Sequence, residues 1–197
     1  MGWLYMQSLN GHSGPRAYLD DQFTWAREGD HSKVLRSALL GRRTYYAAVE
    51  HTGPDDTRIV FAAVCLVRYN PRDYREGYIF GYKDMDESMG PCESDCPQAI
   101  LDLLTPTDSA FALEWRAKCR ANFARRKAQS AKPKPKQGQF IVFDTPLKFS
   151  NGRTLDRFEV VENRRGRRTM LYRDPIAGGL YRIPNVKARD YRLEAAG

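Results

Sequence analysis

A short segment rich in lysine and proline, residues 130–137, constrains the fold of this chain more than any other feature. Its sequence, SAKPKPKQ, alternates the two residue types. Proline fixes its own φ and has no backbone N–H, so the segment favours an extended backbone and cannot be helix. The sequence patterns differ on its two sides. They predict two domains, residues 1–128 and 139–197, joined by a linker over residues 129–138.

Before the linker, several strand patterns follow one another with tight turns between them. Residues 33–40 and 44–50 are typical of a hairpin around Gly41-Arg42-Arg43. The apolar run Ile59 to Val67 predicts a central strand buried on both faces, and residues 78–82 predict the next strand. Strands in direct succession indicate an antiparallel meander rather than alternating β-α units.

One helix is predicted before this meander in the sequence, over residues 15–25. Two are predicted after it, from Pro97 to about Leu104 and over residues 109–128. Pro15 is well placed as a first helical residue. The third helix carries an apolar stripe that recurs every four residues and is expected to pack on the sheet. The stripe consists of Phe111, Trp115, Cys119 and Phe123.

After the linker, five short strand patterns alternate with turns, and Asn151-Gly152 is a hairpin signal. They lie at Gln139–Phe143, Leu147–Phe149, Arg153–Val161, Arg167–Arg173 and Leu180–Ile183. Five such strands predict a small barrel of SH3-like type. The expected fold class is therefore α+β, an antiparallel sheet packed by helices, followed by a small C-terminal β-barrel.

The net charge of +8 is unevenly distributed. Residues 1–110 carry a net charge of −5, and residues 111–197 carry +13. A half with that charge is expected to attract phosphate backbones or another acidic surface; the alternative is a solvated face that binds nothing. The longest apolar run has nine residues, too few to cross a bilayer, and the N-terminus has no signal-peptide pattern. We therefore expect a cytoplasmic protein without a membrane partner, with its four cysteines reduced.

Two groups of basic residues are the candidate nucleic-acid-binding residues. The first is a positive arm without any acidic residue, and the second is an arginine-rich hairpin tip around Gly166 that is suited to clamping phosphates. The arm comprises Arg116, Lys118, Arg120, Arg125, Arg126, Lys127, Lys132, Lys134 and Lys136. The tip comprises Arg164, Arg165, Arg167 and Arg168.

Three tyrosines of the C-terminal segment are each followed by an arginine, in the pairs Tyr172-Arg173, Tyr181-Arg182 and Tyr191-Arg192. Aromatic and cationic side chains on one surface are suited to single-stranded nucleic acid. Alternatively, the tyrosines fill the barrel and the arginines only solvate it. No motif for sequence-specific recognition is visible.

An acidic stretch after residue 82 is a candidate metal site. Clustered carboxylates suit Mg²⁺, and on a continuing strand Asp84 and Asp86 point to the same face, with Glu87 beside them. A metal there would suit phosphodiester chemistry. The alternative is a polar turn whose carboxylates cap backbone amides or pair with the basic half.

Cys92 and Cys96 follow this stretch at the start of a helix. Pro91-Cys92 with Cys96 resembles the second zinc motif of nucleobase deaminases, which also require a His-x-Glu. None of the three histidines supplies that glutamate, and two cysteines alone make no structural zinc site. Cys96 remains a candidate reactive thiol, because a helix N-terminus lowers a thiol pKa.

The stretch GYKDMDESMGPCESDCPQAILDLLTPTD, with the MGW start and EWRAKCR, resembles an uncharacterised bacterial family found on plasmids, phages and other mobile elements. The resemblance covers residues 1–125. It implies a mobile-element setting, in which DNA handling and suppression of host defence are common functions. It implies no catalytic residue.

These observations predict an accessory protein of a mobile element that binds DNA, RNA or a nucleic-acid-processing complex, with anti-restriction or anti-CRISPR activity among its roles. No catalytic residue is predicted for it. The alternative is a metal-dependent enzyme that acts on nucleic acid or nucleotides through Asp84, Asp86 and Glu87. A third hypothesis is an inhibitor whose acidic N-terminal face mimics DNA.

Overall fold

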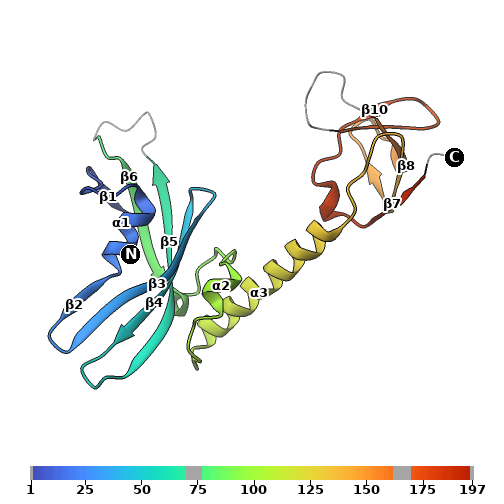
Figure 1. Cartoon of the computed structure of the whole chain (residues 1–197). Helices are drawn as coiled ribbons and strands as arrows, with labels where there is room; N and C mark the ends of the chain where they lie inside the picture. The colour runs from blue at the N-terminus through green and yellow to red at the C-terminus, as the bar shows by residue number, and fades with distance from the viewer. Residues whose placement is uncertain (1, 70–76, 162–169, 196–197) are drawn as a thin grey trace. The chain divides into compact units, whose positions relative to one another are not determined.

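The computed structural model describes residues 2–69, 77–161 and 170–195 of the chain. It divides into two compact units, Met1–Ala124 and Arg125–Gly197. The first unit holds a curved, six-stranded antiparallel sheet that forms a half-barrel (Figure 1). Its strands are β1 (Leu4–Met6), β2 (Trp25–Arg27), β3 (Asp30–Leu40), β4 (Thr44–Thr52), β5 (Arg58–Tyr69) and β6 (Phe80–Asp86).

The strand order is β1-β6-β5-β4-β3-β2, and each neighbouring pair is antiparallel. Strands β2 to β6 pair in sequence order, so the predicted meander is confirmed. The predicted hairpin is confirmed as well, because Leu40 pairs with Thr44 across its turn. The short strand β2 was not predicted. It begins at Trp25, within the range predicted as helix, because the first helix already ends at Gln22.

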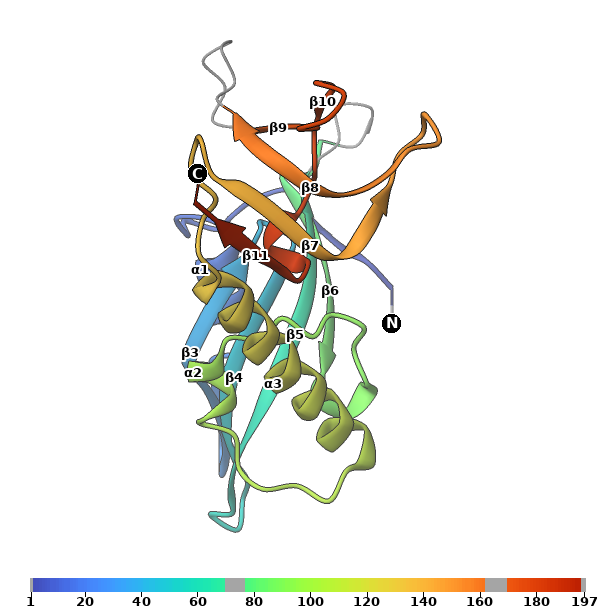
Figure 2. The same ribbon diagram turned by 90° about the vertical axis from the view of Figure 1, so that its right-hand side faces the viewer.

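Helices cover both faces of this sheet. Helix α1 (Pro15–Gln22) lies on one face, and α2 (Gln98–Leu101) and α3 (Ala110–Ala131) lie on the other (Figure 2). Leu19 of α1 is fully buried in one core cluster, and Trp115 of α3 is buried in the other. The sheet therefore separates two apolar cores.

Strand β5 contributes to both cores because successive side chains of a strand point to opposite faces. Ala62 and Val64 belong to the core under α2 and α3, whereas Ala63 and Cys65 belong to the core under α1. All four are fully buried. The prediction of a central strand buried on both faces is confirmed.

The long helix differs from its prediction in two respects. It continues past residue 128 and includes Ser130, because the first proline of the basic segment comes only at Pro133. Its buried face consists of Ala112, Trp115, Arg116 and Cys119. Phe111 is 64% exposed and Phe123 is 39% exposed, so the predicted four-residue stripe is wrong at both ends. A spacing of four drifts around a helix of 3.6 residues per turn, which moves the outer members off the buried face.

The second unit contains a five-stranded antiparallel sheet in the order β10-β9-β8-β7-β11. Its strands are β7 (Phe140–Lys148), β8 (Thr154–Val161), β9 (Leu171–Arg173), β10 (Leu180–Tyr181) and β11 (Tyr191–Glu194). In the described residues β10 and β11 are edges that do not pair with each other, so this sheet does not close into the predicted small barrel. Strand β10 has only two residues, and Pro184 follows closely. It therefore offers too few backbone groups to close the sheet.

One face of this second sheet is covered by its own aromatic side chains. Phe158 is fully buried and lies within 6.0 Å of Phe143, measured between ring centroids, and within 5.8 Å of both Phe149 and Tyr181. The short 3₁₀ helix η2 (Val186–Ala188) packs Val186 against the same cluster.

Candidate nucleic-acid interface

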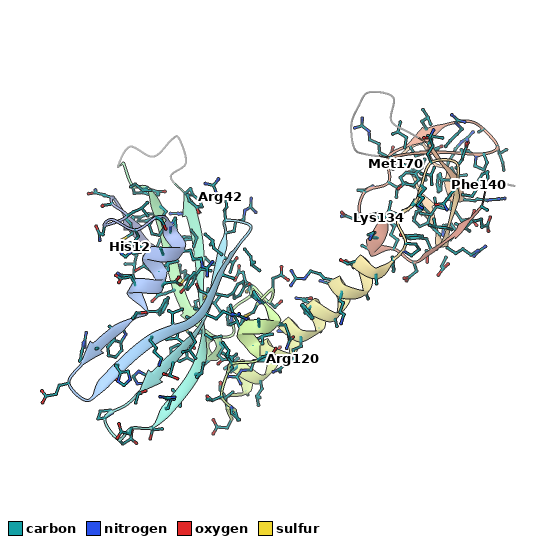
Figure 3. All side chains as sticks on the ribbon, in the orientation of Figure 1. His12, Arg42, Arg120, Lys134, Phe140 and Met170 are labelled. Atoms are coloured by element: carbon teal, nitrogen blue, oxygen red, sulfur yellow. The ribbon has the colours of Figure 1, made fainter. Side chains whose placement is uncertain are left out.

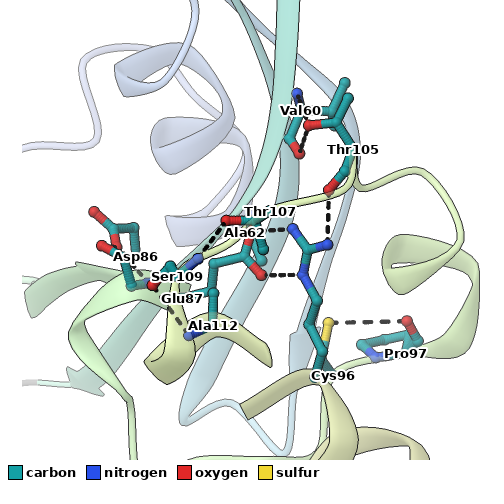
Figure 4. A network of polar contacts seen from close by, with 12 residues as sticks. Val60, Ala62, Asp86, Glu87, Cys96, Pro97, Thr105, Thr107, Ser109 and Ala112 are labelled. Carbon is teal, nitrogen blue, oxygen red and sulfur yellow. Dashed lines mark hydrogen bonds and ion pairs between the residues drawn. The ribbon is translucent and has the colours of Figure 1, made fainter. Parts of the chain in front are cut away.

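The corner after β6, at the 3₁₀ helix η1 (Glu87–Met89), holds a buried ion pair between Glu87 and Arg116. Arg116 of α3 donates from Nε to Glu87 Oε2 at 2.5 Å and from Nη2 to Oε1 at 2.6 Å. Glu87 Oε1 also accepts from the backbone N–H of Ala62, and Arg116 Nη1 donates to the carbonyl of Thr105 (Figure 4). The two side chains are only 5% and 7% exposed. This ion pair connects the sheet, the corner and α3.

The other two carboxylates of the acidic stretch lie on the opposite face of the sheet. Asp84 pairs with Cys65, and Asp86 pairs with Ala63, so both share the face covered by α1. Asp86 also caps η1 by accepting from the backbone N–H of Ser88 at 2.7 Å. The expectation that Asp84 and Asp86 share a face is confirmed, but Glu87 points away from them. Among the described residues no group of three His, Cys, Asp or Glu side chains is arranged to hold a metal ion.

The two candidate cysteines, Cys92 and Cys96, differ in their exposure. Cys96 is fully buried, and burial raises the pKa of its thiol, which is opposite to the activation expected at a helix N-terminus. Helix α2 begins after it, with Pro97 at the cap position. Cys92 is exposed. Cys96 is therefore a core residue and a poor nucleophile.

Arg116, a member of the predicted positive arm, is buried and paired with Glu87. Lys118 pairs with Glu114 one turn earlier, and this partner raises the pKa of its ammonium group. Arg120, labelled in Figure 3, is exposed. Three further members of the arm are exposed on the last part of α3, namely Arg125, Arg126 and Lys127.

The lysine and proline segment is hydrogen-bonded to the second unit. Lys132 donates to the carbonyl of Arg189 and to Asp190 Oδ1, each at 2.8 Å. The hydroxyl of Tyr191 donates to the carbonyl of Pro133 at 2.6 Å. Lys134 (Figure 3) and Lys136 are exposed. The part of the arm around Lys132 and Pro133 is therefore held by hydrogen bonds to residues 189–191 of the second unit. The tip residues Arg164, Arg165, Arg167 and Arg168 lie outside the described residues.

The aromatic and arginine pairs divide between core and surface. Tyr172 is buried, and Tyr181 and Tyr191 are half-buried against the same core. Two of the arginines pair with carboxylates, Arg173 with Glu159 and Arg192 with Glu194. Both observations favour the alternative in which the tyrosines fill the core.

A cleft of about 370 Å³ in the second unit brings three other cations together; we call it the C-terminal cleft. Lys148 ends β7, Arg182 follows β10, and Arg189 follows η2. All three are exposed, and no carboxylate occurs among the residues described as its lining. The ring of Phe149 also lines it and lies 4.3 Å from that of Tyr181.

Sequence reasoning missed Lys148 and Arg189, which no local motif joins. Lys148 and Arg189 line the same cleft only because the fold brings the turn after β7 next to the segment around η2. The only available signal was charge: residues 125–197 contain 18 Lys and Arg but 7 Asp and Glu. Most carboxylates of the sheet are taken by ion pairs, as in Arg153–Asp174 and Arg157–Glu194. The cations of the C-terminal cleft have no such partner among the described residues.

Comparison with known proteins gives one match. A family model described as "Domain of unknown function (DUF6927)" matches residues 106–186, which include α3 and most of the second sheet. The resemblance noted above rests instead on residues 1–125. No curated protein and no solved structure matches the chain. No helix in the described part of the chain is long and apolar enough to span a membrane.

Proposed function

We propose that this protein binds nucleic acid through its C-terminal unit, with the C-terminal cleft as the main phosphate-binding element. The observation that carries the proposal is the grouping of Lys148, Arg182 and Arg189 around one cleft, with no carboxylate among its described lining residues. Unpaired cations release counterions when they contact phosphates, and this release drives sequence-independent binding. Cations that are already paired with carboxylates contribute much less to the free energy of binding.

The exposed part of the arm extends this surface. Lys132 donates to the carbonyl of Arg189, a residue that lines the cleft, so the segment containing Lys134 and Lys136 is tied to one of the lining residues. Arg and Lys contacts to phosphates orient a protein on nucleic acid without reading its sequence. We therefore expect binding with little sequence preference.

The experiment compares two triple variants with equal loss of charge. The test variant replaces Lys148, Arg182 and Arg189 by Gln. The matched control replaces Arg157, Arg173 and Arg192 by Gln, all of which pair with carboxylates in the same unit. Fluorescence anisotropy with labelled single-stranded and duplex oligonucleotides gives the affinities.

We expect the test variant to raise Kd at least tenfold and the control to raise it less than about threefold, since the control changes only the long-range field. Equal effects of the two variants would show that net charge alone, and not the cleft, determines binding. No binding by the unaltered protein would refute the proposal.

We further propose that the protein serves a mobile element as an accessory or anti-defence protein, acting on nucleic acid or on a nucleic-acid-processing host complex. Only the resemblance of the N-terminal residues supports this setting. Affinity capture from host cells, with and without nuclease treatment, tests it. Recovery of a defence or DNA-processing complex supports the role, whereas recovery of ribosomal or metabolic proteins alone contradicts it.

A further inference from the structure

The first unit contains a second cationic cleft, of about 680 Å³, which we call the N-terminal cleft. It is lined by the β3–β4 turn, by the end of β5 and by Trp3. Three arginines face it, Arg42 and Arg43 from the turn and Arg68 from β5. Within the described part of the chain none of the three pairs with a carboxylate. Other arginines of this unit do, for example Arg58 with Glu50.

Aromatic rings hold two of these arginines in place. The guanidinium carbon of Arg68 lies 4.2 Å from the ring centroid of Trp3 and 4.9 Å from that of Tyr5. The guanidinium carbon of Arg42 lies 4.4 Å from the ring centroid of Tyr69. A guanidinium that stacks through its face keeps its N–H donors at the edge, where they match the oxygens of a phosphate.

The turn that carries Arg42 is conformationally unusual. Gly41 and Arg42 both have positive φ, 56° and 58°, and the N–H of Arg43 closes the turn on the carbonyl of Leu40. This is the geometry of a tight hairpin turn, in which Asn or Gly usually occupies the second central position. An arginine there is strained, and such strain persists at positions with a functional role. Figure 3 labels Arg42 at the end of this hairpin.

We propose that the N-terminal cleft binds a nucleoside phosphate, with the phosphate on the arginines and the base against the aromatic rings. Among the described residues that line the cleft, three cations oppose one carboxylate, that of Glu93, so an anion is favoured. Trp3 and Tyr69 provide apolar ring surface beside the cations, the combination that accommodates a base next to its phosphate. The ligand is either a free nucleotide or one unit of a single strand. This site lies in a different unit from the C-terminal cleft and goes beyond the function proposed above.

The test uses the full chain and a double variant, Arg42→Asn with Arg43→Gln. Asparagine tolerates the left-handed backbone at position 42, so the turn is retained. The matched control is Arg27→Gln. Arg27 also stacks on a tryptophan of this unit, with its guanidinium carbon 5.4 Å from the ring centroid of Trp25, but does not line the cleft. Calorimetry measures binding of AMP, adenosine, inorganic phosphate and short oligodeoxythymidylate.

We expect the double variant to weaken binding of AMP at least tenfold, and the Arg27 control to change it less than about twofold. Oligonucleotide binding is compared in chains that also carry the Lys148, Arg182 and Arg189 substitutions, so that the C-terminal cleft does not contribute, and the same changes are expected there. Binding of AMP identifies free nucleotides as the ligand, whereas oligonucleotide binding that the double variant weakens, without binding of AMP, identifies the single strand. Inorganic phosphate that binds as tightly as AMP would overturn the role of the rings. An unchanged affinity in the double variant, or no binding of any probe by the unaltered protein, would overturn the proposal. The C-terminal triple variant keeps the N-terminal cleft intact, so failure of one proposal is distinguishable from failure of the other.

Discussion

Replacing Arg116 by Met should destabilise the first unit strongly. Among the described residues, the substitution leaves the Glu87 carboxylate, 5% exposed, with the N–H of Ala62 at 3.2 Å as its one remaining donor. It also removes the donor from the carbonyl of Thr105. Loss of one partner from a buried ion pair costs about 3–5 kcal/mol, mainly because the other charge stays buried without compensation. We expect a loss in this range.

The second variant removes both charges, with Glu87→Gln added to Arg116→Met. The amide oxygen of Gln still accepts from Ala62, and no unpaired charge remains in the core. Replacement of a buried pair by neutral residues of similar volume is often close to neutral. The double variant should therefore be more stable than Arg116→Met alone, by about 1–3 kcal/mol.

Urea unfolding followed by tryptophan fluorescence is the assay. The three tryptophans of the chain, Trp3, Trp25 and Trp115, all lie in the first unit, so the signal reports that unit alone. With a slope of about 2 kcal/mol/M, the single variant should lower the midpoint by roughly 2 M. A midpoint within about 0.3 M of the unaltered protein, or a double variant no more stable than the single, would refute the reasoning.

Three further predictions concern packing, thiol chemistry and pH. Gly81→Ala should destabilise the first unit by about 1–3 kcal/mol in the same urea assay, because an added Cβ would lie 2.8 Å from the ring of Tyr5; an unchanged midpoint would contradict the β1–β6 packing. A chromogenic disulfide reagent should modify one thiol rapidly in the folded chain, that of exposed Cys92, and the other three only on unfolding; rapid modification of all four would contradict their burial. The N–H groups of Ile176 and Ala177, with Arg153, hold the pKa of Asp174 below its usual range. Its stabilising contribution should be full above the unfolded pKa of about 3.9 and lost as pH falls through the lower folded value. In melts followed by circular dichroism, Asp174→Asn should reduce the loss of stability at low pH. A pH profile identical to that of the unaltered protein would contradict this prediction.

The fold of the first unit was predictable because its signals are local. The apolar run Ile59 to Val67 and the turn at Gly41-Arg42-Arg43 determine β5 and the hairpin without tertiary information. The exposure of Phe111 was not predicted, because the sheet contacts only one side of α3 and leaves Phe111 outside that contact. Local sequence patterns also could not predict whether the second sheet closes, because closure depends on pairing between two edge strands that are distant in sequence.

The candidate sites were less predictable than the fold. Asp84, Asp86 and Glu87 are neighbours in sequence, yet the end of β6 sends Glu87 to Arg116 on the opposite face. Both cationic clefts join residues that are distant in sequence. Arg68, for example, meets Arg42 only through the pairing of β4 with β5. Charge composition indicated cationic surfaces, but tertiary pairing decided which cations remain without carboxylates.

The salt dependence of nucleic-acid binding tests the central claim most directly. The slope of log Kd against log salt concentration counts the phosphates that the protein neutralises, at about 0.7 per phosphate for single strands and about 0.9 for duplexes. We predict a steep slope for the unaltered protein and a slope lower by about 2 for the variant that lacks Lys148, Arg182 and Arg189. The paired-arginine control should keep the full slope. A slope near zero for the unaltered protein, or an unchanged slope in the cleft variant, would contradict phosphate binding at the C-terminal cleft.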